Sequence, residues 1–138
     1  MIPLIDLAVD AQVLARLKKS VNRVIDSNSY ILGNELINFE KAFAKFVRTR
    51  FAVGLNSGTD ALRLAMRAVG VKPGDKILTV AFTSPFTVLA IIEEGAIPVF
   101  CDVDSDTMTI DVSDARKKLD SHVRAIIPVH LYGNPCNM

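Results

Sequence analysis

Residues 1–50 carry apolar side chains at the spacing of helices. Between residues 13 and 25, apolar residues recur at three and four positions, which is the spacing of one helix face. These residues are Leu14, Leu17, Val21 and Val24. Turn formers in residues 27–33 interrupt the period, and a second apolar stripe then follows at Leu36, Phe39, Phe43 and Phe46. The pattern predicts two amphipathic helices with Tyr30 on the loop between them.

From residue 51 onward, short apolar runs alternate with helical periods. Strands are predicted at residues 51–55, 76–80, 98–101 and 123–129. Helices are predicted at residues 59–69, within 85–94 and at 112–119. Strands that alternate with helices favour a parallel or largely parallel sheet covered on both faces. We therefore expect an N-terminal helical segment, residues 1–50, followed by an α/β domain in residues 51–138.

Composition narrows the class of protein. The 138 residues include 16 basic and 15 acidic ones without a run of like charge, so nothing attracts nucleic acid or a membrane surface. The apolar runs are shorter than the roughly 20 residues of a spanning helix, and residues 1–6 show no signal peptide. Cys101 and Cys136 are far apart and have no metal-binding spacing with the histidines. A soluble, cytoplasmic protein without a metal site is expected, with both cysteines reduced.

The most informative turn is Asn-Ser-Gly-Thr-Asp-Ala-Leu at residues 56–62, where a predicted strand runs into a helix. The first N–H groups of a helix are unpaired and its dipole is positive there, so such a turn can hold a phosphate. Gly58 would allow close approach of an anion, and the Thr59 hydroxyl can donate a further hydrogen bond. The alternative is simple capping of the helix by Ser57 or Thr59.

The turn after the next strand, residues 81–87, opens on the same side of the predicted sheet. Ligands of open α/β sheets lie beyond the carboxyl ends of the strands, and both turns lie at such ends. Phe82 and Phe86 offer aromatic rings there, as a flat cofactor ring would require. The alternative for either phenylalanine is packing in the core.

Five segments together resemble one family. They are Tyr-Ile-Leu-Gly at 30–33, Ala-Val-Gly-Leu-Asn-Ser-Gly-Thr-Asp-Ala-Leu at 52–62, Lys-Pro-Gly-Asp at 72–75, Gly-Ala-Ile-Pro-Val-Phe at 95–100 and Ile-Ile-Pro-Val-His-Leu-Tyr-Gly at 126–133. Their order and spacing are similar to the N-terminal part of the DegT family of pyridoxal-phosphate-dependent sugar aminotransferases. The resemblance covers nearly the whole chain.

The resemblance implies the large domain of a fold-type I aminotransferase, with a mostly parallel sheet. It implies pyridoxal phosphate as cofactor and transfer of an amino group, often from glutamate, to a nucleotide-linked keto-sugar by a homodimer. Gly58 and Thr59 then fall where the family holds the cofactor phosphate. Phe82 and Phe86 become candidates for stacking on its ring, and Tyr30 falls near the mouth of the active site as a substrate-binding candidate.

Two departures from the family pattern bear on the chemistry. Many members have a stacking aromatic residue where this chain has Ser84, so either Phe82 or Phe86 would take that role. The family's Schiff-base lysine and its acid at the pyridine nitrogen lie beyond residues 130–133, so no residue of this chain is assigned as catalytic. The 138-residue chain alone is therefore expected to be inactive, and the alternative interpretation is a truncated fragment that binds phosphate or cofactor at most.

The other polar candidates receive structural interpretations. Asp102 and Asp104 are expected to cap a turn at the end of a strand, and His122 is expected at the surface. His130 is either part of the site or structural. A regulatory nucleotide-binding module of the Rossmann type is a weaker interpretation, because its G-x-G-x-x-G turn has no counterpart in residues 56–62.

Overall fold

The computed structural model describes residues 7–138, so the prediction about a signal peptide in residues 1–6 lies outside the described residues. The chain divides into two compact units, one ending at Gly54 and one comprising Leu55–Met138. Each unit has its own secondary structure and is described by itself.

The first unit contains the two helices that the apolar spacing predicts. Helix α1 spans Ala11–Ser27 and helix α2 spans Asn34–Phe46. The carboxylate of Asp10 caps α1 by accepting a hydrogen bond of 2.8 Å from the N–H of Val13, and α1 ends at Asn28 in the left-handed conformation. The apolar stripe of α1 is not buried, since Leu17 is 51% exposed and Val21 is 56% exposed.

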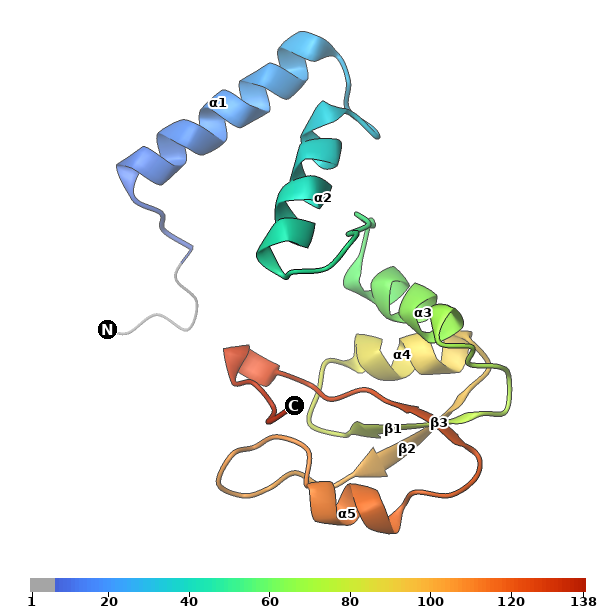
Figure 1. Ribbon diagram of the computed structural model, residues 1–138. Helices are drawn as coiled ribbons and strands as arrows, with labels where there is room; N and C mark the ends of the chain where they lie inside the picture. Colours follow the sequence, from blue (N-terminus) through green and yellow to red (C-terminus); the bar gives the residue numbers. More distant parts are fainter. Residues whose placement is uncertain (1–6) are drawn as a thin grey trace. The chain divides into compact units, whose positions relative to one another are not determined.

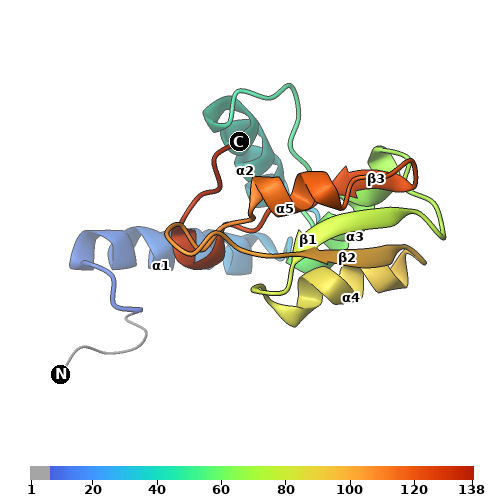
Figure 2. The same cartoon turned by 90° about the horizontal axis from the view of Figure 1, so that it is seen from below.

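The second unit is a three-stranded parallel sheet in the order β2-β1-β3. The strands are β1 (Lys76–Val80), β2 (Ile97–Cys101) and β3 (Val123–Ile126). The helices are α3 (Gly58–Ala68), α4 (Pro85–Glu93), α5 (Val112–Lys117) and the short 3-10 helix η1 (Leu131–Gly133). Figures 1 and 2 show α3 and α4 on one face of the sheet and α5 on the other. The predicted α/β class with a parallel sheet is confirmed.

The core lies on both faces of the central strand β1. Successive side chains of a strand point to opposite faces, and four of the five residues of β1 are buried. Ile77 packs with Met66 of α3 and Ile91 of α4, whereas Leu78 packs with Ala115 of α5. Burial of Ile77 and Leu78 on opposite faces therefore joins both helical layers to the sheet.

Two of the predicted strands differ from the structure. Residues 51–55 form no strand, because a strand needs a hydrogen-bonded neighbour and the N–H of Gly54 instead donates to the Glu40 carboxylate at 2.8 Å. The strand predicted at 123–129 ends at Ile126. Pairing with β1 continues for one residue, since Ile127 donates to the Leu78 carbonyl at 2.8 Å, and the chain then leaves the sheet toward η1.

Candidate functional site

Ser57 is the residue that caps helix α3. Its hydroxyl oxygen accepts from the N–H of Asp60 at 3.1 Å and donates to the Asp60 carboxylate at 2.9 Å. The Ser57 hydroxyl therefore bonds both the backbone and the side chain of the third helical residue. Thr59 lies inside the first turn of the helix and makes no cap bond, so Ser57 is the cap of the two residues that the sequence left open.

The cap leaves the first two amide groups of α3 available. Within the described residues, no acceptor is bonded to the N–H of Gly58 or of Thr59. The position where a side chain of Gly58 would begin has no atom within 4 Å, so the backbone faces open space there. Two unpaired amides at the positive end of a helix, beside a residue without a side chain and beside the Thr59 hydroxyl, fit the shape and charge of a phosphate group.

The N-termini of α3 and α4 lie at the same end of the second unit. The two helices pack against each other, and Arg67 near the end of α3 reaches Glu94 just after the end of α4, so the helices run in the same direction. Helix α4 begins directly after the carboxyl end of β1. The turn that contains Gly58 and Thr59 and the turn after β1 therefore open at the carboxyl edge of the sheet, as the sequence predicts.

Phe82 and Phe86 are not part of the core. Phe82, in the turn after β1, is 39% exposed, and Phe86, in the first turn of α4, is 59% exposed. Ser84 is the N-cap of α4, although its hydroxyl makes no cap bond, and Pro85 occupies the first helical position. Thr83 and Thr87 are joined by a hydrogen bond of 2.9 Å between their hydroxyls, which ties this turn to the helix. Both phenylalanine rings thus remain accessible at the rim of the sheet.

His130 precedes η1 after the carboxyl end of β3. Its ring Nδ1 accepts a hydrogen bond of 2.9 Å from the N–H of Cys136. The Cys136 thiol donates to the carbonyl of Val129 at 3.3 Å, which closes a small loop around the histidine. His130 is exposed at the edge where the other candidate residues lie, while its Nδ1 serves a structural contact.

The remaining polar candidates have structural roles. Asp104 caps a turn by accepting hydrogen bonds from Thr107 and Asp106, which hold the pKa of its carboxyl below the ordinary value. Cys101 is buried, and burial raises the pKa of its thiol. His122 is exposed, as expected.

The described residues include neither a metal-binding cluster nor a membrane-spanning helix. Among residues 7–138, no group of three or more His, Cys, Asp or Glu side chains is arranged to hold a metal ion. In that same part of the chain, no helix has both the length and the apolar character needed to cross a membrane.

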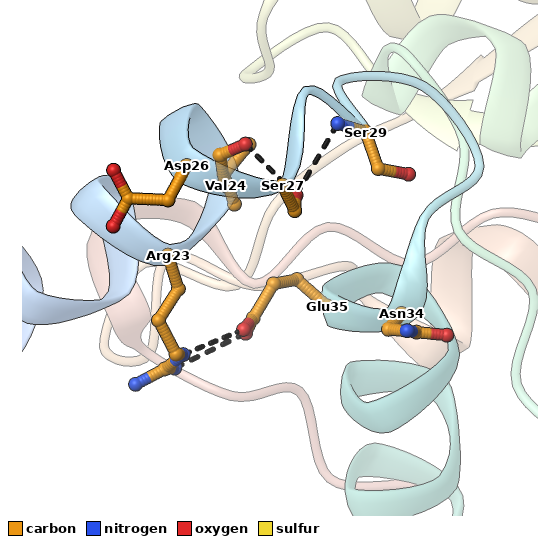
Figure 3. A pocket seen from close by; sticks show the side chains of 7 residues that line it. All are labelled: Arg23, Val24, Asp26, Ser27, Ser29, Asn34 and Glu35. Atoms are coloured by element: carbon orange, nitrogen blue, oxygen red, sulfur yellow. Dashed lines mark hydrogen bonds and ion pairs between the residues drawn. The ribbon is translucent and has the colours of Figure 1, made fainter.

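Tyr30 belongs to the first unit, on the loop between α1 and α2. It is 63% exposed, and its hydroxyl donates to the Asn28 side chain at 3.4 Å. A hollow lies beside this loop, where the guanidinium of Arg23 faces the carboxylate of Glu35 at 3.0 Å (Figure 3). The hollow is lined by Arg23, Val24, Asp26, Ser27, Ser29, Asn34 and Glu35. The assignment of Tyr30 to a substrate site stays a prediction.

An ion-pair network between α3 and α4 was not predicted from the sequence. The Glu94 carboxylate is 8% exposed and accepts hydrogen bonds from Arg67 and from Arg63, the latter at 2.9 Å. These bonds hold the pKa of Glu94 below its ordinary value. Arg63 also lies 3.2 Å from Glu93 and 3.6 Å from the Asp60 carboxylate. The spacing of Arg63 and Arg67 places both on one helix face, but it contains no signal of their partner on another helix.

Comparison with known proteins identifies the family. The DegT/DnrJ/EryC1/StrS aminotransferase family matches residues 12–138. The chain belongs to this family, and the resemblance inferred from the five sequence segments is confirmed.

Individual relatives and solved structures agree with that assignment. The chain is 41% identical over 138 residues to the dTDP-3-amino-3,4,6-trideoxy-alpha-D-glucose transaminase of Streptomyces venezuelae, with 99% of this chain and 36% of that protein covered. The structure of S. venezuelae DesV is similar with a TM-score of 0.86 at 40% identity, over 91% of this chain and 34% of that one. Bacillus subtilis NtdA with bound cofactor PMP has a TM-score of 0.86 at 26% identity, over 94% and 30% of the two chains. The chain thus spans about a third of the length of these relatives.

The cap assignment leads to a prediction about stability. Ser57→Ala removes the oxygen that accepts from the Asp60 N–H, and we expect the free energy of unfolding of the ligand-free protein to fall by about 1 kcal/mol. Thr59→Val is the matched control, because Thr59 makes no cap bond and its loss should cost clearly less. Chemical denaturation of the two variants measures the difference. Equal losses would mean that Ser57 is not the dominant cap.

Proposed function

We propose that this chain supplies the phosphate-binding part of a pyridoxal-phosphate-dependent aminotransferase that acts on a nucleotide-linked keto-sugar. The observation that carries the proposal is the open first turn of α3, with free amides at Gly58 and Thr59 in a chain of the DegT/DnrJ/EryC1/StrS family. The bound PMP in NtdA supports pyridoxal phosphate as the cofactor, because PMP is its amine form.

The residues of this chain bind and orient the cofactor. The N–H groups of Gly58 and Thr59 and the Thr59 hydroxyl donate to the phosphate oxygens. Many family members have a stacking aromatic residue at the position of Ser84. In this chain one of the two accessible rings, Phe82 or Phe86, stacks on the pyridine ring instead. When bound, pyridoxal phosphate supplies the electron sink for amino transfer, and the protein fixes where its ring lies.

The substrate class follows from the relatives. The name of the S. venezuelae relative describes a transaminase of a dTDP-linked amino sugar, which supports a nucleotide-linked keto-sugar as the amino acceptor. We propose an amino acid such as glutamate as the donor. We propose that Tyr30 contacts this substrate. We further propose that the protein acts as a homodimer in the cytoplasm.

A transamination assay tests the proposed function. The assay uses an enzyme of the full family length that contains this chain, called the intact protein below. With pyridoxal phosphate and glutamate, a panel of nucleotide-linked keto-sugars should give the amino sugar and 2-oxoglutarate, detected by mass spectrometry. The 138-residue chain by itself should give no turnover, because none of its lysines stands in the family's Schiff-base motif. Absence of product from the intact protein with every keto-sugar, despite bound cofactor, would contradict the substrate assignment.

Thr59 is expected to matter for the cofactor more than for the fold. Thr59→Val removes a hydrogen bond to a charged group, so we expect cofactor binding by the intact protein to weaken by about 1.5 to 3 kcal/mol. The melting temperature of the cofactor-free protein should change little. Calorimetric titration with PMP, together with thermal melts, measures both. A sharp fall in melting temperature with unchanged affinity would show that Thr59 is a structural residue.

Paired substitutions identify the stacking ring. Phe82→Leu and Phe86→Leu each keep an apolar side chain but lose the aromatic face, so the variant at the stacking position should lose about 0.5 to 1.5 kcal/mol of PMP binding. The other variant should resemble the parent, as should the control Leu89→Val on α4. If neither substitution at a phenylalanine weakens binding, the ring is held by another part of the protein.

A further inference from the structure

The first turn of α3 contains a charge that works against phosphate binding. Asp60 is the third residue of the helix, and Ser57 holds its carboxylate at the same rim as the free amides of Gly58 and Thr59. A carboxylate at a helix N-terminus is stabilised by the positive end of the dipole, and it competes with any other anion for that potential. A phosphate bound at this turn would therefore meet a fixed negative charge close by.

Arg63 is placed to offset that charge. It lies one turn along α3 from Asp60, and its guanidinium nitrogen is 3.6 Å from the Asp60 carboxylate. Arg63 is half-buried, with 31% of its side chain exposed, so its charge is screened less than that of a fully exposed residue. Asp60 and Arg63 also line one hollow, together with Arg67 and Glu94.

Helix α4 holds Arg63 in this position. The Glu94 carboxylate bonds the Arg63 guanidinium at 2.9 Å, and Glu93 lies 3.2 Å from it. These contacts prevent the long side chain from extending freely into water. Arg67 shares Glu94, but no contact joins Arg67 to Asp60 in the described part of the chain. The two arginines therefore have the same anchor and differ in whether they reach the first turn.

We propose that Arg63 is a positioning residue for cofactor binding: held by Glu94, it neutralises Asp60 and so keeps the first turn of α3 favourable for the cofactor phosphate. This inference rests on the proposed function, since it requires that phosphate bind at Gly58 and Thr59. Arg63 acts through Asp60 and does not itself contact the phosphate. Removal of the Asp60 charge should therefore restore the affinity that is lost when Arg63 is removed.

A double-mutant cycle tests the proposal in the cofactor-free intact protein, with PMP as the ligand and calorimetry as the measurement. PMP forms no Schiff base, so its affinity reports non-covalent contacts only. Arg63→Met should weaken PMP binding about threefold to fivefold, the upper part of the range for loss of a partly exposed charge pair. The double variant Asp60→Asn/Arg63→Met should return to within about twofold of the parent affinity, because both charges of the pair are then removed. Arg63→Lys, which keeps the charge, should restore most of the parent affinity.

Arg67→Met is the matched control. It removes one positive charge and one bond to Glu94, as Arg63→Met does, but it leaves the pair with Asp60 in place. Its PMP affinity should stay within about twofold of the parent protein. Thermal melts of all variants separate loss of folding from loss of binding.

Three outcomes are distinguishable. A double variant that binds PMP as weakly as Arg63→Met would overturn the proposal, because the charge of Asp60 would then not be what Arg63 offsets. An equal loss from Arg67→Met and Arg63→Met would also overturn it, because the effect would be one of net charge. Failure of the parent protein to bind PMP at all would instead contradict the proposed function.

Discussion

Burial of strand β1 on both faces is the constraint on which the second unit depends. Ile77 and Leu78 are fully buried on opposite sides, so the strand cannot slip by one residue without exchanging its two sets of contacts. The parallel pairing of β1 with β2 and β3 places three carboxyl ends at one edge of the sheet. The turns that carry the candidate site residues are fixed at this edge because the core holds the strands that lead to them.

The beginning of α3 leaves unpaired amides for the proposed phosphate site after the helix is capped. A helix start offers more unpaired amides than one cap can satisfy. Ser57 uses the N–H of Asp60, which stabilises the helix and leaves the two amides nearest the open space of Gly58 for a ligand. The same arrangement brings the Asp60 carboxylate to the rim, so the local charge balance depends on Arg63 and, through it, on α4.

The proposed aminotransferase reaction needs both cofactor binding and proton transfer. The geometry of this chain concerns cofactor binding. The described residues at the sheet edge supply donors for an anion and aromatic rings for a flat group. Binding and orientation are the contributions that such residues make to cofactor chemistry, whereas proton transfer needs a group of suitable pKa beside the reacting atom. In the proposed function, Thr59 and one of Phe82 and Phe86 belong to the first kind of residue.

Sequence alone determined the features that depend on local pattern. Helical spacing predicted α1 and α2, and the alternation of apolar runs with helical periods predicted the parallel sheet, because these signals lie within a few residues of one another. The five family segments, including the Ser-Gly-Thr turn at residues 57–59, were also readable without coordinates.

Only the tertiary structure decided what depends on distant partners. Residues 51–55 have the composition of a strand but no paired neighbour among the described residues, and the choice of Ser57 over Thr59 as cap required hydrogen-bond geometry. The pair of Arg63 and Glu94 joins residues 31 positions apart, and such a contact exists only once α3 and α4 pack against each other on one face of the sheet.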